Sequence, residues 1–153
     1  MLKIFNPKTT AAPVGSYSHG VEVPPNARWL HIAGQVPVRP DGSVPATIEE
    51  QTEVVMQNIM QVLIAAGMGI SDVVKVNSYL TKHENFARFA PVRAKYLGDH
   101  RPASTLAVIS SLAKAEFLVE VEAIAAKAVG ATKAVAGAAK KKAPAKKAKK
   151  RSR

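Results

Sequence analysis

The chain loses its large apolar residues after position 126, and this break separates two parts that can fold very differently. Residues 128–153 hold ten Lys and Arg residues and no acid, with two valines as their only larger apolar residues. Such a segment buries too little apolar surface to offset the entropy lost on ordering. The whole chain has 22 Lys and Arg against 11 Asp and Glu, and removing the ten of the tail leaves 12 against 11. We expect one domain over residues 1–127 and a disordered, Lys/Ala/Pro-rich basic tail over residues 128–153.

Composition also limits the chemistry that this chain can perform. Cysteine is absent, which excludes disulfides, thiolate catalysis and Cys-ligated zinc. No apolar run approaches the roughly 18 residues of a membrane span, and the first residues lack the layout of a signal peptide. The sequence contains no phosphate-binding glycine loop. The four histidines are scattered and lack the spacing of metal ligands (His19, His31, His83 and His100). We expect a cytoplasmic protein with no metal site.

Apolar periodicity and turn residues predict eight elements in the order β-β-β-α-β-α-β-β. A capping box at Thr47 and Glu50 begins the first helix, and Gly67 ends it. Asn85 is the expected cap of a second helix that reaches about Tyr96, and a proline inside it predicts a late start or a kink. The predicted strands cover residues 2–5, 16–23, 29–36, 72–80, 103–110 and 117–126.

This order of elements predicts an α+β domain, in which a two-layer mixed sheet carries both helices on one face. The other face needs a cover too, because apolar residues are numerous in the predicted strands. Examples are Val21, Val23, Val119 and Val121. A dimer or a trimer that buries this second face is therefore expected.

Glu120 and Glu122 are the strongest candidates for chemistry. They lie two residues apart on the last predicted strand, so both side chains point to the same face of the sheet. Two acids on an otherwise apolar strand are costly to bury without hydrogen bonds. They fit either a solvent-exposed sheet face or a cleft in which a carboxylate transfers protons to and from a water or a substrate.

The chain resembles a known family, the Rid family (RidA/YjgF, also called endoribonuclease L-PSP). The resemblance runs from about residue 3 to residue 127 and leaves out the tail. Its motifs occur in the family's order and spacing, at residues 15–17, 32–38, 47–67, 72–75, 101–103 and 119–125.

The resemblance implies a chorismate-mutase-like α+β fold, assembled as a homotrimer with clefts between the subunits. It also implies a deaminase that hydrolyses reactive enamines and imines, such as 2-aminoacrylate, to 2-keto acids and ammonia without a cofactor. Tyr17 matches the family's pocket tyrosine, and Glu120 matches the acid that handles the hydrolytic water. Gly34, Ser104 and Thr105 fall on segments that bind the substrate.

Ser104 is the main departure from the family pattern, because it stands where the family's arginine holds the substrate carboxylate. A guanidinium offers a charged, two-pronged grip, whereas a serine offers one neutral hydrogen bond. Arg101 and Arg93 are the candidate replacements. Three further family positions are changed, at Ala33, Ala90 and Leu106. Either imine hydrolysis continues with altered activity, or this chain binds or transforms another small molecule.

The basic tail is typical of the Lys/Ala/Pro segments of linker-histone type. Such segments bind phosphate backbones by releasing counterions and do not read the sequence. No aromatic residue is present for base stacking. Non-specific DNA or RNA binding by residues 133–153, contact with an anionic membrane surface, and a solubilising tail without a target all remain open.

Overall fold

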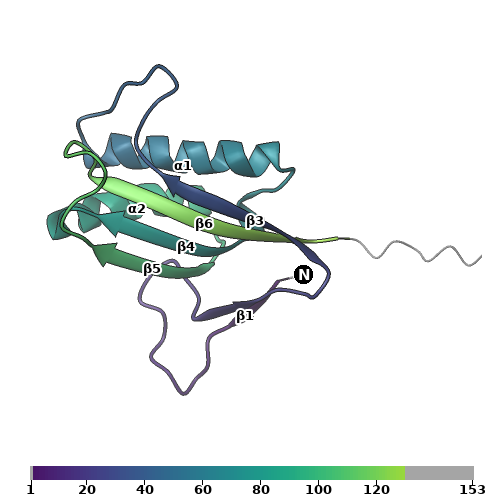
Figure 1. Cartoon of the computed structure of the whole chain (residues 1–153). Helices are drawn as coiled ribbons and strands as arrows, with labels where there is room; N and C mark the ends of the chain where they lie inside the picture. The colour runs from purple at the N-terminus through teal and green to yellow at the C-terminus, as the bar shows by residue number, and fades with distance from the viewer. Residues whose placement is uncertain (1, 130–153) are drawn as a thin grey trace, which may run out of the picture.

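The computed structural model describes residues 2–129, and its elements follow the predicted order (Figure 1). The expected tail lies almost wholly outside the described residues. Two single 3-10 turns, η1 (Ile70–Asp72) and η2 (His83–Asn85), precede β4 and α2. The strands are β1 (Lys3–Phe5), β2 (Gly20–Glu22), β3 (Ala27–Gln35), β4 (Val73–Leu80), β5 (Ala103–Val108) and β6 (Val119–Ala128), and the helices are α1 (Ile48–Ala65) and α2 (Phe86–Leu97).

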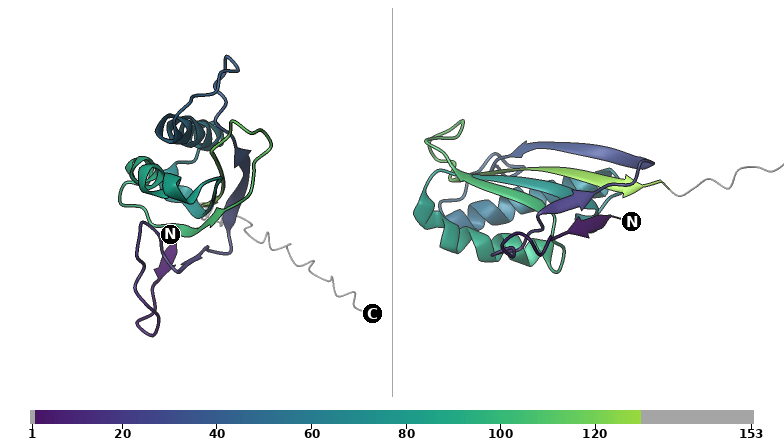
Figure 2. Two further views of the ribbon diagram at one scale, coloured as in Figure 1. Left: turned by 90° about the vertical axis from the view of Figure 1, so that its left-hand side faces the viewer. Right: turned by 90° about the horizontal axis from the view of Figure 1, so that it is seen from below.

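The main sheet has the strand order β3-β6-β4-β5 and is mixed. β6 pairs antiparallel with β3 and β4, whereas β4 and β5 are parallel and need the crossover that α2 supplies. β1 and β2 form a separate antiparallel pair. Figures 1 and 2 show both helices on the same face of the main sheet, which confirms the predicted two-layer α+β fold.

Local signals at both ends of α1 work as expected. The Thr47 hydroxyl accepts a hydrogen bond from the backbone N–H of Glu50 at 3.3 Å and donates one to its carboxylate at 3.0 Å. At the other end Gly67 adopts φ +67°, and the N–H of Met68 bonds back to the Leu63 carbonyl at 2.8 Å. This is the Schellman arrangement, in which a left-handed glycine ends the helix.

The core lies between the helices and one face of the sheet. Val119, Val121, Ala123 and Ala125 alternate along β6 and are at most 3% exposed. The prediction that Val119 and Val121 lie on the face needing a partner is therefore wrong. Because side chains alternate along a strand, these valines face α1 and α2.

The second face of the sheet, here called the open face, is polar where β4 pairs with β6, although Trp29 and Ile124 lie on its β3 side. Tyr79 pairs directly with Glu120, and Asn77 with Glu122, so these four residues share the open face. All four are half-buried in the single chain. Polar residues rather than buried valines therefore occupy the face for which a covering partner was predicted.

Two details of α2 differ from the sequence-based expectation. Asn85 makes no side-chain capping bond, because it ends a 3-10 turn that leads directly into the helix. α2 begins at Phe86, five residues before Pro91, so the proline does not delay its start. Lys95 and Tyr96 hydrogen-bond to the Glu53 carboxylate on α1, which ties the two helices together.

The predicted strand 16–23 is shortened to Gly20–Glu22. Ser18 explains the difference, because its N–H and its hydroxyl donate to the carbonyls of Pro102 and Arg101 at 3.0 and 2.7 Å. These bonds fold the preceding loop against the start of β5. Tyr17 is therefore held beside β5 and not in a strand.

The last strand passes the predicted domain boundary. β6 continues to Ala128, which pairs with Ala27 on β3. Val129 still exchanges hydrogen bonds with Asn26 at 3.1 and 2.7 Å. A shortened chain that keeps the domain intact should therefore end after Val129 and not after residue 127.

Candidate active site

Two hydrogen bonds fix the Glu122 carboxylate on the open face. Asn77 Nδ2 and Tyr79 Oη both donate to its Oε1, at 2.7 and 3.1 Å. The bond to Glu122 raises the pKa of Tyr79 above its usual value, and burial and the negative charges of Glu122 and Glu120 act in the same direction. Glu122 thus ties β6 to β4 through two side-chain hydrogen bonds on the open face.

Glu120 differs from its neighbour, because no described residue donates a hydrogen bond to its carboxylate. It lies against Gly34, at a bulge between Ile32 and Gln35 of β3. A Cβ on residue 34 would lie 1.8 Å from Glu120 Oε1, so only glycine leaves room for the carboxylate in this position. A free carboxylate held against bare backbone is suited to binding and deprotonating a water.

The open face is hollowed beside Glu122, whereas Glu120 is not among the residues that line the hollow. Lys75 crosses it and donates to Thr105 Oγ1 at 2.7 Å, so Thr105 belongs to the open face with Glu120. The hollow has a volume of about 430 Å³. Its lining residues are His31, Ile32, Ala33, Lys75, Asn77, Glu122, Ala123 and Ile124.

A second cavity, here called the α2 pocket, lies on the helix side of the sheet and measures about 320 Å³. Tyr17 and Ser104 both line it, which brings together two residues that are 87 positions apart in the sequence. Most of its wall is apolar or aromatic. The lining residues are Val14, Gly15, Ser16, Tyr17, Ser78, Phe86, Phe89, Ala90, Arg93, Ser104 and Leu106.

Arg93 supplies the positive charge of the α2 pocket. Its Nη2 donates to Ser104 Oγ at 2.8 Å, and no carboxylate of residues 2–129 lies within 4 Å of it. Burial lowers the pKa of the guanidinium below its usual value, although an arginine stays protonated at neutral pH. The pocket thus contains a desolvated cation without a counter-ion.

Arg101 has a different task. Its Nη1 donates to the carbonyls of Gly98 and His100, at 2.6 and 3.0 Å, just after the C-terminus of α2. It is not among the residues that line the α2 pocket. Of the two arginines that the sequence offered as replacements for the missing one, only Arg93 contacts Ser104 in the structure.

The predicted site residues therefore fall into two groups on opposite faces of the sheet. Ser104 pairs with the buried Val76 and lies on the helix side, whereas Glu120 pairs with Tyr79 on the open face. β4 also separates β6 from β5. A single chain does not bring Glu120 and the α2 pocket together.

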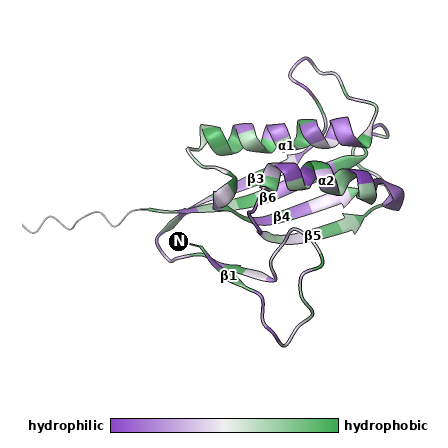
Figure 3. Ribbon diagram, turned by 180° about the vertical axis from the view of Figure 1, so that it is seen from behind, coloured by the Kyte–Doolittle hydropathy of each residue, from purple (hydrophilic) through white to green (hydrophobic). Residues whose placement is uncertain are grey.

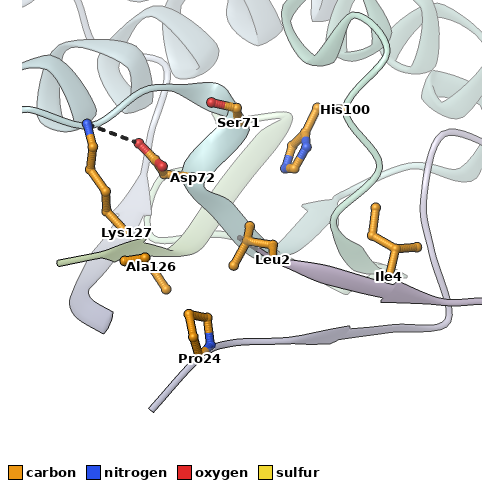
Figure 4. A pocket seen from close by; sticks show the side chains of 9 residues that line it. Leu2, Ile4, Pro24, Ser71, Asp72, His100, Ala126 and Lys127 are labelled. Carbon is orange, nitrogen blue, oxygen red and sulfur yellow. Dashed lines mark ion pairs between the residues drawn. The ribbon is translucent and has the colours of Figure 1, made fainter. Parts of the chain in front are cut away.

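A third cavity, of about 420 Å³, lies between β1 and the end of β6 (Figure 4). Its charged side chains and its histidine already have partners. Lys127 Nζ lies 3.7 Å from Asp72 Oδ2, the ion pair drawn in Figure 4, and Asp72 also accepts from the N–H of Gly69. The His100 ring bonds to the Val73 carbonyl at 2.6 Å.

The model of the family described as endoribonuclease L-PSP matches residues 8–127 of this chain. The chain belongs to this family, the Rid family. Sequence relatives agree: this Rid protein is 36% identical to the RutC family protein PH0854 of Pyrococcus horikoshii, over 83% of this chain and 99% of that protein. It is 38% identical to the protein HMF1 of Saccharomyces cerevisiae, over 78% and 90% of the two chains.

Solved structures of the family share the fold of this Rid protein. The Rid-family protein YyfB from Yersinia pestis superposes with a TM-score of 0.73 at 35% identity, over 81% of this chain and 97% of that one. Escherichia coli TdcF, solved with bound serine, superposes with a TM-score of 0.61 at 26% identity, over 82% and 99%. TdcF carries the name "Putative reactive intermediate deaminase". Within residues 2–129, no helix is both long and apolar enough to cross a membrane.

Sequence reasoning missed Ser78 in this Rid protein. Ser78 is 1% exposed, lies on β4 between the buried Val76 and Leu80, and lines the α2 pocket. The sequence did contain a clue. Ser78 alternates with valine and leucine on the apolar side of its strand, where a serine is costly to bury without a hydrogen-bond partner. Recognising it requires knowing which face of the strand packs against the helices.

Proposed function

We propose that this Rid protein hydrolyses reactive enamines and imines derived from amino acids to 2-keto acids and ammonia. The observation that carries the proposal is the free Glu120 carboxylate at Gly34, because hydrolysis of a C=N bond needs a base for water. The family resemblance and the name of TdcF support the same reaction class. No cofactor takes part in the proposed reaction.

The proposed reaction needs one proton acceptor that later returns the proton. An enamine first tautomerises to its imine. Glu120 then takes a proton from water as the oxygen bonds to the imine carbon, and the nitrogen is protonated. The resulting carbinolamine loses ammonia as its C–N bond breaks and the C=O bond forms. The sum is one water consumed for one ammonia and one keto acid released.

We place the complete site between protomers of a homotrimer. Exposed apolar side chains surround the mouth of the α2 pocket: Val14 is 95% exposed, Phe86 47% and Leu106 37%. Figure 3, which views the molecule from the helix side, shows the apolar stretch of β5 beside α2. Apolar patches of this kind mark subunit contacts. In the proposed trimer such a contact brings Glu120 of one protomer to the α2 pocket of another, where Tyr17 faces the substrate.

The direct test is a deaminase assay on a freshly generated imine. A pyridoxal-phosphate dehydratase supplied with serine or threonine releases 2-aminoacrylate or 2-iminobutyrate in the cuvette. We expect the Rid protein to accelerate keto-acid and ammonia formation above the rate in buffer. Semicarbazide, which traps the imine, provides the readout, because hydrolysis competes with the trapping reaction. A rate equal to that in buffer, for both substrates, would contradict the proposal.

A second candidate function is binding without turnover. The observation that favours it is Ser104, which stands at the family's anchoring position without a charge of its own. In that case the same site holds a small molecule of different shape, and keto acids bind although imines are not hydrolysed. Thermal-shift measurements across keto acids and aromatic carboxylates separate this candidate from an active deaminase.

For the tail we propose non-specific binding of DNA or RNA through residues 133–153, which lie outside the described residues. The proposal is supported by ten cations without an acid in residues 128–153. We expect the full chain to bind duplex DNA with an affinity that falls steeply with salt. A chain ending at Val129 should lose this binding and keep its melting temperature. Equal DNA affinity of the two chains would contradict the proposal that the tail binds nucleic acid.

A further inference from the structure

The α2 pocket contains more hydrogen-bond donors than the protein satisfies. Arg93 Nε and Ser78 Oγ are both buried, and neither has a partner within residues 2–129. Both residues line the same cavity. Buried polar groups in native proteins are nearly always hydrogen-bonded, so two orphans in one pocket indicate a missing acceptor.

The positive charge of the pocket indicates that the missing acceptor is an anion. Arg93 is the one charged residue among those lining the α2 pocket. Taking a guanidinium out of water without a counter-ion is costly, and a bound anion offsets that cost. The guanidinium fork matches a carboxylate, which accepts two parallel N–H bonds. A dianionic phosphate fits less well, because a single cation would leave its second charge unpaired in a largely apolar cavity.

The apolar side chains of the pocket wall determine which substituent the ligand can carry beside its carboxylate. Phe86, Phe89, Ala90 and Leu106 surround the polar group, and the cavity of about 320 Å³ accommodates a branched or aromatic side chain. We propose that the α2 pocket binds the carboxylate of a small organic acid with an apolar substituent, and that Arg93, oriented by Ser104, is its anchor. Arg93 thus supplies from α2 the charge that β5 lacks at Ser104.

The assignment of this acid as an imino acid or its keto-acid product rests on the proposed function, whereas carboxylate binding does not. The substrate class then becomes imines of branched-chain or aromatic amino acids. Small imines such as 2-aminoacrylate fill less of the apolar wall and should be used with a higher KM. This specificity concerns the bound side chain, and Glu120 performs the same step for each substrate.

The experiment measures binding of a stable keto acid to the full-length protein by calorimetry at low salt. The probe is 4-methyl-2-oxopentanoate, and its neutral amide is the comparison. We expect the acid to bind and the amide to bind much more weakly. Arg93→Met should weaken binding of the acid roughly 10- to 100-fold, because a charged hydrogen bond is lost. The affinity of Arg93→Lys for the acid should lie between those of the wild type and Arg93→Met.

Arg88→Met is the matched control, because Arg88 lies on the same helix but pairs with Glu49 at the surface. It should bind the acid as the wild type does. Arg93→Met should also keep the wild-type oligomeric state and melt no lower, since it removes an unpaired buried charge. A lower melting temperature or dissociation of the oligomer would assign Arg93 to structure and overturn the proposal. Equal affinity of Arg93→Met and wild type for the acid would overturn it as well.

The two proposals fail in different ways. If the wild type binds the keto acid through Arg93 but hydrolyses no imine, the pocket assignment stands and the deaminase proposal fails. If imines are hydrolysed and Arg93→Met leaves both KM and keto-acid binding unchanged, the deaminase proposal stands and the pocket assignment fails.

Discussion

Glu120→Gln is expected to lower the rate of imine hydrolysis by about 10²- to 10⁴-fold, the usual contribution of a general acid–base group. Glutamine keeps the shape of the side chain but cannot accept the proton of water. The melting temperature should stay close to that of the wild type, because no described residue depends on this carboxylate for a hydrogen bond. The measurement is keto-acid formation in the dehydratase-coupled assay, with circular dichroism to check the fold.

Gly34→Ala is the matched variant for this prediction, because it retains the carboxylate but moves it. The new Cβ would lie 1.8 Å from Glu120 Oε1, so the side chain must rotate away. The moving atoms are the end of a flexible side chain, and the cost in stability should be small. Activity should nevertheless fall as in Glu120→Gln, and the two changes together should be no worse than either alone. Wild-type rates in both variants would show that Glu120 takes no part in the reaction.

The two ends of α1 could be predicted from the sequence because their signals are local. The capping box at Thr47 and the stop at Gly67 each involve atoms within four or five residues of one another, so composition and spacing suffice. The common side of Glu120 and Glu122 follows in the same way from strand periodicity. These features need no knowledge of the partner elements.

The sequence does not show which face of the sheet the helices cover. Alternation places Val119 and Val121 opposite Glu120 and Glu122, but it does not say which set the helices cover. That choice depends on how α1 and α2 pack across the sheet, and the structure places the valines beneath them. The centre of the open face is consequently polar, and the proposed oligomer is supported mainly by the exposed apolar residues around the α2 pocket.

The arginine that contacts Ser104 could not be predicted from the sequence either. Arg101 lies three residues before Ser104, the wrong parity for the same strand face unless the proline between them turns the chain. Nothing in the sequence shows whether Arg93, on the second helix, reaches Ser104. Hydrogen bonds between elements distinguish the two arginines. Arg101 donates to a backbone carbonyl just after α2, whereas Arg93 donates to Ser104 on β5. In the proposed site, the positive charge of the anchor lies on a helix and not on the strand that carries Ser104.

Complementation between two impaired protomers, assayed at substrate concentrations below KM, tests whether the site is shared. Glu120→Gln removes the base on the open face, and Arg93→Met removes the anchor in the α2 pocket. In one chain these residues lie on opposite faces of the sheet, so each site should take one residue from each of two protomers. Mixed oligomers, refolded together and isolated through two different affinity tags, should then contain some sites with both groups intact.

The decisive measurement is the imine-hydrolysis rate of these mixed oligomers beside that of each variant alone. We expect activity to return to about a third of the wild-type level in the isolated mixed trimers, because each of them pairs an intact base with an intact anchor at one of its three sites. Oligomers made from Glu120→Gln and the double variant should stay inactive. Mixed oligomers as inactive as their parents, from a wild type that hydrolyses imines, would contradict a site shared between protomers.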